Sequence, residues 1–303
     1  MSLRITKATD PIEVKTITVC IYAGPGRGKS TLGFTAATPL LLDFDHGAYR
    51  AGKRGDTVQV ESWADVSSMT VDDLKPFSTL IVDTAGRALD ALSATIITEN
   101  PKLGRGGSLT LQGFGELKSR FTGWLKFVRQ LGLDVVLISH SDEKQNGDEM
   151  IERLDIQGGS KNEIYKVADS MGRLYIEGGK RVLNFNPTDT AFGKNPAQLP
   201  PLPVPHYTQA PNFLGEVIAG IKGELNRQSE EQVRAASLLA DWKAKIDEAK
   251  TAEDFTTLLP TTKDADALVR ENVQRMFAAA AKAKGYKWDK KASAFVTAEQ
   301  KAA

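Results

Sequence analysis

Ile21-Tyr-Ala-Gly-Pro-Gly-Arg-Gly-Lys-Ser-Thr-Leu32 is the stretch of sequence that decides the fold. Apolar, β-prone residues over 17–22 lead into it, and a helix-compatible run follows over 30–37. A glycine-rich loop that joins a strand to a helix and ends in Gly-Lys-Ser is a P-loop, whose backbone N–H groups turn inward on phosphate oxygens. The positive end of the following helix adds to this attraction. The stretch therefore predicts a phosphate site, and the alternative is a glycine-rich turn with a chance Gly-Lys-Ser.

The residue types in this loop predict which group binds which part of a nucleotide. Ala23 stands where the usual pattern has its first glycine, and we expect Gly24 and Gly26 to give the loop its freedom at φ > 0. Lys29 is expected to reach the β- and γ-phosphates, and the Ser30 hydroxyl to hold Mg²⁺. An Asn-Lys-x-Asp motif, which reads guanine, is absent, so ATP and Mg²⁺ are the predicted cofactors. The predicted nucleotide-binding residues are Gly24, Pro25, Gly26, Arg27, Gly28, Lys29, Ser30 and Thr31.

Apolar runs alternate with helical patterns through the first two thirds of the chain. Runs that are apolar throughout are typical of strands buried on both faces of a parallel sheet. This alternation predicts an α/β fold with a mostly parallel sheet and helices on both faces. The expected strands are 17–22, 39–45, 57–61, 78–83 and 134–140, and the expected helices between them are 63–74, 85–98 and 118–131.

Ala23, Asp45, Asp83 and His140 stand at the carboxyl ends of four of these strands. Right-handed crossovers place such ends along one edge of the sheet, where open α/β sheets bind their ligands. We therefore expect the four residues to lie around one site.

Acidic residues end two of the strands. Asp83 follows an apolar run, which is the Walker B pattern of a carboxylate that orients Mg²⁺ and its water; the alternative is an N-cap of the next helix. Asp43 and Asp45 face the same side of their strand, because side chains alternate. A carboxylate here could polarise the water that attacks the γ-phosphate. We favour Asp45, and the alternative is a solvated strand end.

His140 gives the strand over 134–140 a polar tip. It could touch the γ-phosphate and report its loss to the following segment, and the alternative is a locally hydrogen-bonded histidine. With three histidines and one cysteine, no zinc site is expected.

The composition narrows the class of protein. A net charge of +1 over 303 residues excludes a global attraction to nucleic acid, so any such site must be local. Cys20 is the single cysteine, which excludes an internal disulfide framework and fits a reducing compartment. No run approaches the length of apolar sequence that crosses a membrane. We expect a cytoplasmic protein with no membrane partner.

Two polar segments, 99–115 and 141–163, interrupt the alternation and are predicted as loops. Both carry cations beside glycines, and Phe114 could offer a stacking face. Such loops can track a phosphate backbone, and the alternative is ordinary surface loops. Further on, 170–185 reads as two strands around Gly178-Gly179.

Six prolines between 194 and 211 mark a domain boundary. We assign 1–195 to the core, 196–211 to a Pro-rich linker and 212–303 to a C-terminal helical region that serves as an interaction module. The expected helices there are 212–225, 229–250 and 263–284, with a hairpin over 285–296.

Several motifs in order resemble those of the RecA-like ATPases, most closely the small phage RecA-like proteins of the single-strand-annealing or recombinase type. The resemblance covers roughly residues 15–205. Leu41-Leu-Asp-Phe-Asp-His-Gly47 is similar to the segment whose acid–histidine pair supplies the catalytic carboxylate. Leu80-Ile-Val-Asp-Thr84 matches Walker B, and Val136-Leu-Ile-Ser-His140 resembles the strand that couples nucleotide to DNA.

The resemblance implies a RecA-like core and assigns roles to single residues. Asp45 would take the carboxylate role, and His140 would stand where RecA has a glutamine. The two polar segments are similar in position to the two DNA-binding loops, and Gly158-Gly159 is similar to the pair that closes the second. Gly193-Lys-Asn195 resembles the segment that inserts a lysine into the neighbouring subunit's ATP site. Lys194 would then act in trans, and the alternative is a solvated loop lysine.

The leading hypothesis is an ATPase that binds single-stranded DNA and promotes annealing or recombination, as an oligomer or filament with ATP between subunits. One alternative is an ATPase that acts on a protein partner, such as a helicase loader, through 212–303. Another is a nucleotide-dependent switch that hydrolyses slowly. The predicted catalytic residues are Lys29, Asp45, His140 and Lys194, and the predicted metal-holding residues are Ser30 and Asp83.

Overall fold

The structure is a computed structural model that describes residues 5–7, 9–146, 149–156 and 160–297. By contacts, the chain divides into two units. The larger is Val14–Leu225, and the smaller combines Met1–Glu13 with Asn226–Ala303. No helix in the described ranges is long and apolar enough to cross a membrane.

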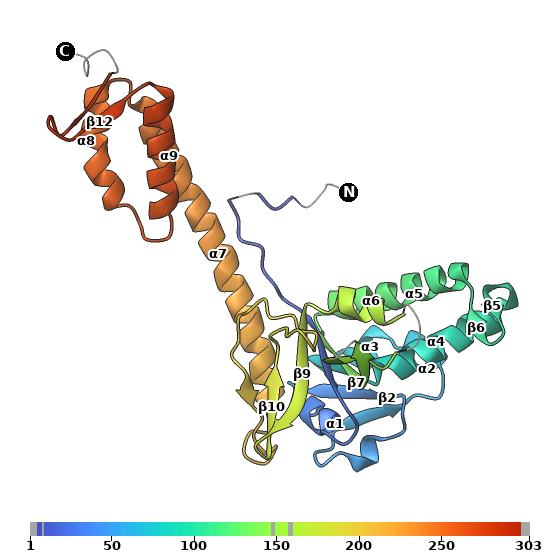
Figure 1. Ribbon diagram of the computed structural model, residues 1–303. Coiled ribbons are helices and arrows are strands. Elements are labelled where there is room, and N and C mark those ends of the chain that lie inside the picture. The colour runs from blue at the N-terminus through green and yellow to red at the C-terminus, as the bar shows by residue number, and fades with distance from the viewer. Residues whose placement is uncertain (1–4, 8, 147–148, 157–159, 298–303) are drawn as a thin grey trace. The chain divides into compact units, whose positions relative to one another are not determined.

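One central sheet forms the centre of the larger unit. Its strands are β1 (Thr18–Ala23), β2 (Pro39–Asp43), β3 (Asp56–Gln59), β4 (Thr79–Asp83), β7 (Asp134–Asn146), β8 (Glu149–Leu154), β9 (Ser170–Glu177), β10 (Lys180–Asn184) and β11 (Leu202–Pro203). In the described ranges they follow the order β11-β10-β9-β1-β7-β4-β2-β3, with β8 attached to β7. Figure 1 labels β10, β9, β7 and β2 of this sheet. The strands from β9 to β3 in this order are parallel, and β10 pairs antiparallel with both β9 and β11.

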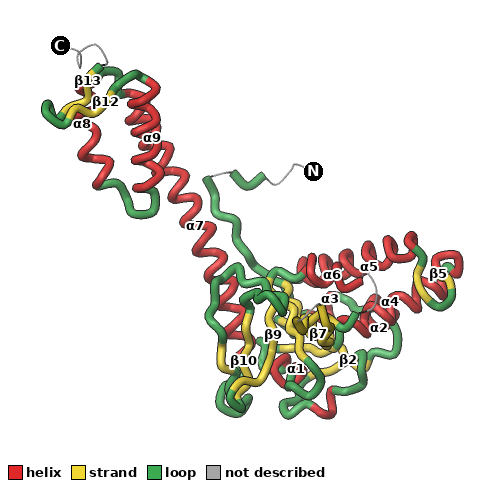
Figure 2. The backbone as a smooth tube through the Cα atoms, in the orientation of Figure 1, coloured by secondary structure: helices red, strands yellow, loops and turns green. Residues whose placement is uncertain are grey.

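Helices and short turns lie between these strands, and a long helix follows the last of them (Figure 2). They are α1 (Lys29–Gly33), η1 (Ala48–Arg50), α2 (Trp63–Ser67), α3 (Val71–Leu74), α4 (Ala85–Glu99), η2 (Pro101–Leu103), α5 (Leu111–Gln130), α6 (Ser160–Val167) and α7 (Phe213–Glu248), with a small hairpin of β5 (Gly104–Arg105) and β6 (Ser108–Leu109).

Both faces of the sheet are buried, because successive side chains of its apolar strands point to opposite sides. In β1, Cys20 and Tyr22 join the apolar cluster under α4 and α5. Val19 and Ile21 join the cluster under α1 and the first turns of α7. The predicted α/β fold, with a mostly parallel sheet, helices on both faces and C-terminal helices, is confirmed.

The helix after the P-loop is shorter than the predicted run of 30–37, since α1 ends at Gly33. The Thr35 hydroxyl donates to the carbonyl oxygen of Leu32 (2.6 Å), which competes with a continuing helix. The same hydroxyl accepts the N–H of Leu214, and the Thr35 carbonyl accepts that of Gly215, both at 3.1 Å. The start of α7 thus occupies the groups at the end of α1.

The first polar segment, predicted as a loop over 99–115, is mostly η2, the β5–β6 hairpin and the start of α5. α5 begins about two turns earlier than predicted because the Thr110 hydroxyl accepts the N–H of Gly113 (3.2 Å) as an N-cap. The glycines concealed this start, since glycine is a poor helix former. The tip of the hairpin is a tight turn at Gly106 and Gly107, whose φ values are 58° and 79°.

The second polar segment, predicted as a loop over 141–163, is a hairpin followed by α6. β7 continues beyond the central sheet and pairs antiparallel with β8, from Ser141 opposite Leu154 to the end of the hairpin. The prediction was wrong because a charged ribbon has the same composition as a loop. Gly158 and Gly159, expected to close the loop, lie outside the described residues.

The Pro-rich segment 196–211 packs on the larger unit. β11 pairs with β10, and Leu199, Leu202 and Val204 pack against the cluster under α1 and α7. Contacts divide the chain after Leu225, inside α7, whereas the sequence placed the linker at 196–211. The assignment of 1–195 to a core and 212–303 to an interaction module stays a prediction.

The smaller unit contains the later part of α7, α8 (Ala252–Lys263), α9 (Arg270–Ala283) and a hairpin of β12 (Lys287–Asp289) and β13 (Ala294–Val296). The first two predicted helices of this region are one continuous helix, α7, and the predicted hairpin is present. Phe255, Phe277 and Phe295 form its aromatic centre, with ring centroids 5.2 to 6.1 Å apart.

The substitution Phe121→Ala tests the cluster under α4 and α5. Phe121 is fully buried between Trp63 and Trp124, so the cavity should lower the free energy of unfolding by about 3–5 kcal/mol. Phe114→Ala, on the same helix at a 36% exposed side chain, should change it by less than about 1 kcal/mol. Urea unfolding followed by tryptophan fluorescence measures both. Equal shifts for the two variants would contradict this account of the core.

Candidate functional site

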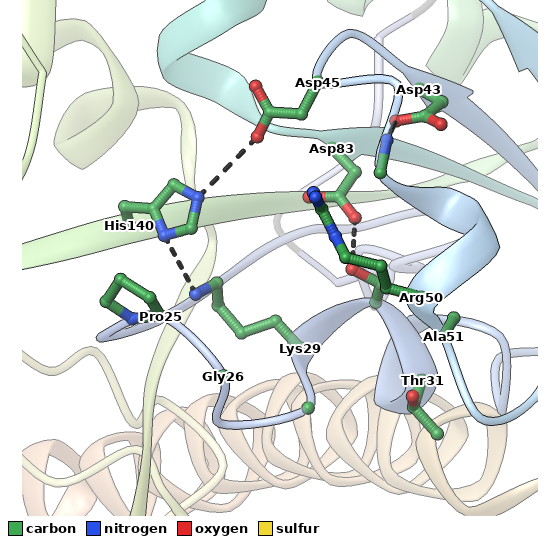
Figure 3. Close-up of a pocket in the computed structure, with 13 residues that line it drawn as sticks. Pro25, Gly26, Lys29, Thr31, Asp43, Asp45, Arg50, Ala51, Asp83 and His140 are labelled. Carbon is green, nitrogen blue, oxygen red and sulfur yellow. Dashed lines mark hydrogen bonds and ion pairs between the residues drawn. The ribbon is translucent and has the colours of Figure 1, made fainter.

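The strand register brings the predicted residues to one edge of the sheet. Ala23 of β1 lies opposite His140 of β7, and Asp83 of β4 lies between Ile138 of β7 and Asp43 of β2. A cavity of about 470 Å³ opens there (Figure 3). The predicted residues that line it are Pro25, Gly26, Gly28, Lys29, Ser30, Thr31, Asp45, Asp83 and His140.

Two glycines turn the P-loop. Gly26 has φ 72°, as predicted, and Gly28 has φ 91° and forms the N-cap of α1. Gly24 does not take a positive φ, so the expectation for it was wrong. The left-handed residue is needed at Gly28 instead, because the chain must turn there into the helix. Gly24 contributes its carbonyl oxygen, which contacts Lys29.

Lys29 is buried, and its ammonium group is held by the loop itself. Its Nζ donates to the carbonyl oxygens of Ala23 (2.9 Å) and Gly24 (3.0 Å) and lies 3.2 Å from Nδ1 of His140. Burial lowers the pKa of Lys29 from 10.5 to about 8, although two nearby carboxylates offset part of the effect. A bound phosphate would compete with the two carbonyl groups for this ammonium.

Ser30 and Asp83 present two adjacent oxygen atoms. The Ser30 hydroxyl donates to Oδ2 of Asp83 at 2.5 Å, and burial raises the pKa of Asp83 in spite of this bond. Mg²⁺ binds through one or two such oxygens together with phosphates and water, so the pair fits this ion. Within the described ranges, no group of three or more His, Cys, Asp or Glu side chains could hold a metal. The remaining ligands would therefore come from a nucleotide and water.

Asp43 and Asp45 are not equivalent. The buried Asp43 carboxylate accepts the backbone N–H groups of Gly47 (2.9 Å) and Ala48 (2.8 Å), and so holds the turn that begins η1. Asp45 is partly exposed to the cavity, and its Oδ1 lies 3.4 Å from Nε of Arg87. Of the two acids, Asp45 is therefore the one available to a ligand.

His140 lies between Lys29 and Asp45 (Figure 3). A protonated lysine only donates, so Nδ1 must accept from Lys29, and the ring proton then sits on Nε2. Nε2 lies 3.6 Å from Oδ2 of Asp45. The contact with His140 lowers the pKa of Asp45 more than burial raises it, and Arg87 lowers it further. Asp45 is therefore ionised near neutral pH.

Sequence reasoning missed Arg50 and Arg87 at this cavity. Arg50 lines it from the end of η1, and Arg87 pairs with Asp45 from the first turn of α4. A signal existed for Arg87, because it follows Asp83 by about one helical turn at the sheet edge. Arg50 lies shortly after Asp45, the acid favoured from the sequence, in the segment that leaves the same strand. This closeness in sequence was the signal for Arg50.

Arg181 of β10 was also missed, and it contacts the P-loop from the other side. Its Nε donates to the carbonyl oxygen of Arg27 (2.9 Å). A Cβ placed on Gly28 would lie 3.1 Å from Nε of Arg181. No local signal could have found it, because an antiparallel strand returns it to the loop from far along the sequence.

Lys194 lies apart from this cavity. Its Nζ donates to the carbonyl oxygen of Ala168 (2.7 Å), just before the start of β9. β9 is parallel to β1, so this position is at the amino edge of the sheet, opposite the P-loop. The structure therefore does not bring Lys194 to the site of its own chain.

Comparison with protein-family models matches part of the chain. Residues 15–197, well over half of the sequence, match the family model AAA_24, which describes an AAA domain. No curated protein matches the chain.

Two solved structures are similar to part of the chain. One is a prototypical ATPase from the type III secretion system of pathogenic bacteria, with 13% identity over 52% of this chain and 51% of that chain and a TM-score of 0.35. The present chain thus spans about half the length of that ATPase. The other is the RadB recombinase, with 14% identity over 55% of this chain and 79% of that chain and a TM-score of 0.33.

The family match includes the P-loop, the acids at the strand ends and His140. The chain belongs to the AAA_24 family, and its larger unit carries an AAA-type P-loop ATPase domain.

Proposed function

We propose that the protein hydrolyses MgATP at this edge of the sheet and uses the cycle to bind single-stranded DNA and promote annealing or recombination. The observation that carries the proposal is the chain of contacts from Lys29 through His140 to the ionised Asp45, beside the Ser30–Asp83 pair. It supplies a cation for phosphate, oxygen atoms for a metal ion and a carboxylate for water within one cavity.

Phosphate binding falls to the P-loop. Lys29 exchanges its contacts with the loop carbonyls for β- and γ-phosphate oxygens, which restores a full charge to the ammonium. Ser30 and Asp83 would hold Mg²⁺, which would supply positive charge to offset that of the phosphates.

Asp45 positions the attacking water. Its lowered pKa makes it a weak base, so it orients water by accepting a hydrogen bond. His140 donates from Nε2 toward Asp45 and faces Lys29 through Nδ1. Any movement of Lys29 toward phosphate therefore changes the partners of His140, which is how His140 would sense the γ-phosphate.

Lys194 is proposed to act on a neighbouring subunit in an oligomer or filament. Its position at the amino edge excludes its own ATP site, and a contribution to another subunit's site is the role that remains for it in ATP chemistry. There it would neutralise charge that develops on the phosphates.

The DNA site is proposed at the β5–β6 hairpin and the start of α6. The two polar segments line one cavity of about 370 Å³, to which Phe114 contributes from one segment and Ser160 from the other. Lys102 and Arg105 are exposed at the hairpin. No ion pair or side-chain hydrogen bond holds either cation among the described residues, so both are available to phosphates.

The β7–β8 hairpin favours the second candidate function, an ATPase that acts on a protein partner. Residues 141–155 contain six acidic and two basic residues, which repels a phosphate backbone. Met150 is half exposed there. An acidic ribbon with an apolar side chain fits a basic protein surface better than DNA.

The pH dependence of ATP binding tests Lys29. Its pKa is about 8 without phosphate, and phosphate stabilises the charged form, so binding takes up a proton above this pH. Affinity should fall by up to about tenfold per pH unit between pH 8 and 9.5. Titration calorimetry in two buffers with different ionisation enthalpies measures both quantities. Lys29→Arg keeps its charge and should give a flat profile. A flat wild-type profile without proton uptake would refute the assignment.

Asp45→Asn tests the water-positioning role. The substitution should lower kcat by about 10²–10⁴-fold and leave the Kd for ATP within about twofold, because Asp45 does not hold phosphate. Phosphate release and equilibrium binding give the two quantities. The matched control is Asp56→Asn. Asp56 is exposed at the start of β3, at the edge of the sheet away from the cavity. A loss of affinity equal to the loss of kcat would show that Asp45 acts in binding instead.

The double variant Lys102→Ala/Arg105→Ala tests the DNA site. Anisotropy of a labelled single-stranded oligonucleotide, with and without an ATP analogue, should show a weaker complex. The slope of log K against log salt should fall by about 1.4, for two lost phosphate contacts. The matched control, Lys75→Ala/Lys126→Ala, removes two exposed lysines elsewhere on the same unit. Wild-type protein that binds no single-stranded DNA, with turnover raised by a protein partner, would favour the second candidate.

A further inference from the structure

A second cavity of about 320 Å³ adjoins the phosphate cavity in the larger unit. The two share Gly26, Gly28, Thr31 and Arg50 as walls. Its far wall is formed by 204–207, within the segment that the sequence predicted as a linker. A ligand held by the P-loop would therefore extend into a space bounded by the Pro-rich segment.

An aromatic surface faces this space. The rings of His206 and Tyr207 lie 4.4 Å apart between centroids, with an interplanar angle of 33°. Tyr207 lies over Gly52, where an added Cβ would be 3.1 Å from its ring. Gly52 is itself fixed, because its N–H donates to the Thr31 hydroxyl (3.0 Å). The P-loop helix and the aromatic wall are therefore held at a set spacing.

The other walls suit the remainder of a nucleotide. Leu32, Val204 and Phe213 supply apolar surface, and the guanidinium groups of Arg50 and Arg181 stand at the P-loop side. Apolar walls with a few hydrogen-bond donors are typical of sites that bind a planar polar ring. Both arginines line this second cavity. An arginine that contacts phosphate would therefore also face the rest of the ligand.

We infer that this second cavity binds the ribose and base of a purine nucleoside triphosphate, with Tyr207 as the stacking surface and a specificity-determining residue. The inference rests on the proposed function, because the phosphates of the same ligand occupy the P-loop. Stacking on an aromatic side chain favours purines, which have the larger ring system. The Pro-rich segment is then part of the nucleotide site.

Equilibrium binding of ATP, CTP and inorganic tripolyphosphate, each with Mg²⁺, tests the inference. The wild type should bind ATP more tightly than CTP and more tightly than tripolyphosphate. Tyr207→Ala should weaken ATP binding by about fivefold or more and leave tripolyphosphate binding unchanged, which also shows that the variant is folded. Tyr207→Phe keeps the ring and should behave as the wild type. Gly52→Ala, which narrows the cavity against the Tyr207 ring, should weaken ATP binding alone.

Each contrary outcome has a separate meaning. Equal loss of ATP and tripolyphosphate binding in Tyr207→Ala, or no loss of either, would overturn the assignment of the second cavity while the phosphate site stands. Wild-type protein that binds CTP as tightly as ATP would overturn the preference for purines. Wild-type protein that binds none of the three ligands would refute the proposed function itself, and this inference with it.

Discussion

Hydrogen bonding between parallel strands is the constraint on which the site depends. Ala23 lies opposite His140, and Asp83 lies opposite both Ile138 and Asp43, so β1, β2 and β4 end, and β7 leaves the central sheet, along one edge. A slip of one residue in any strand would exchange its two faces, so its side chains would meet the wrong packing partners in the two apolar clusters. The alternation that fills the two apolar clusters therefore also sets the positions of the polar strand ends, and core stability and site geometry have a common cause.

The parts of this arrangement that depend on local sequence were predictable. The P-loop, the buried strands and their polar ends follow from composition and spacing within short windows. The start of α5 was missed although Thr110 is a good N-cap, because the neighbouring glycines suggested a loop. Arg181 and Tyr207 could not be found in this way. They reach the P-loop through the antiparallel strand β10 and the Pro-rich segment, which are contacts between distant parts of the chain.

The two polar segments differ in their charge. They line a common cavity, yet the exposed cations Lys102 and Arg105 lie at the first of them, while the β7–β8 hairpin is strongly acidic. A ligand with a phosphate backbone would meet attraction on one and repulsion on the other. The same charge difference could orient a single strand along the first hairpin, or direct a basic protein to the second. Local charge therefore separates the two candidate functions more clearly than topology does.

The contacts of Lys29 have a further consequence for turnover. The carbonyl oxygens of Ala23 and Gly24 compete with any phosphate for the Lys29 ammonium, because both already accept hydrogen bonds from it. Such a competitor lowers affinity for every phosphate ligand, but it also provides the ammonium with partners as soon as a product leaves. Departure of the product then leaves no buried cation without a hydrogen bond. An internal competitor of this kind favours rapid exchange of ligand over tight retention.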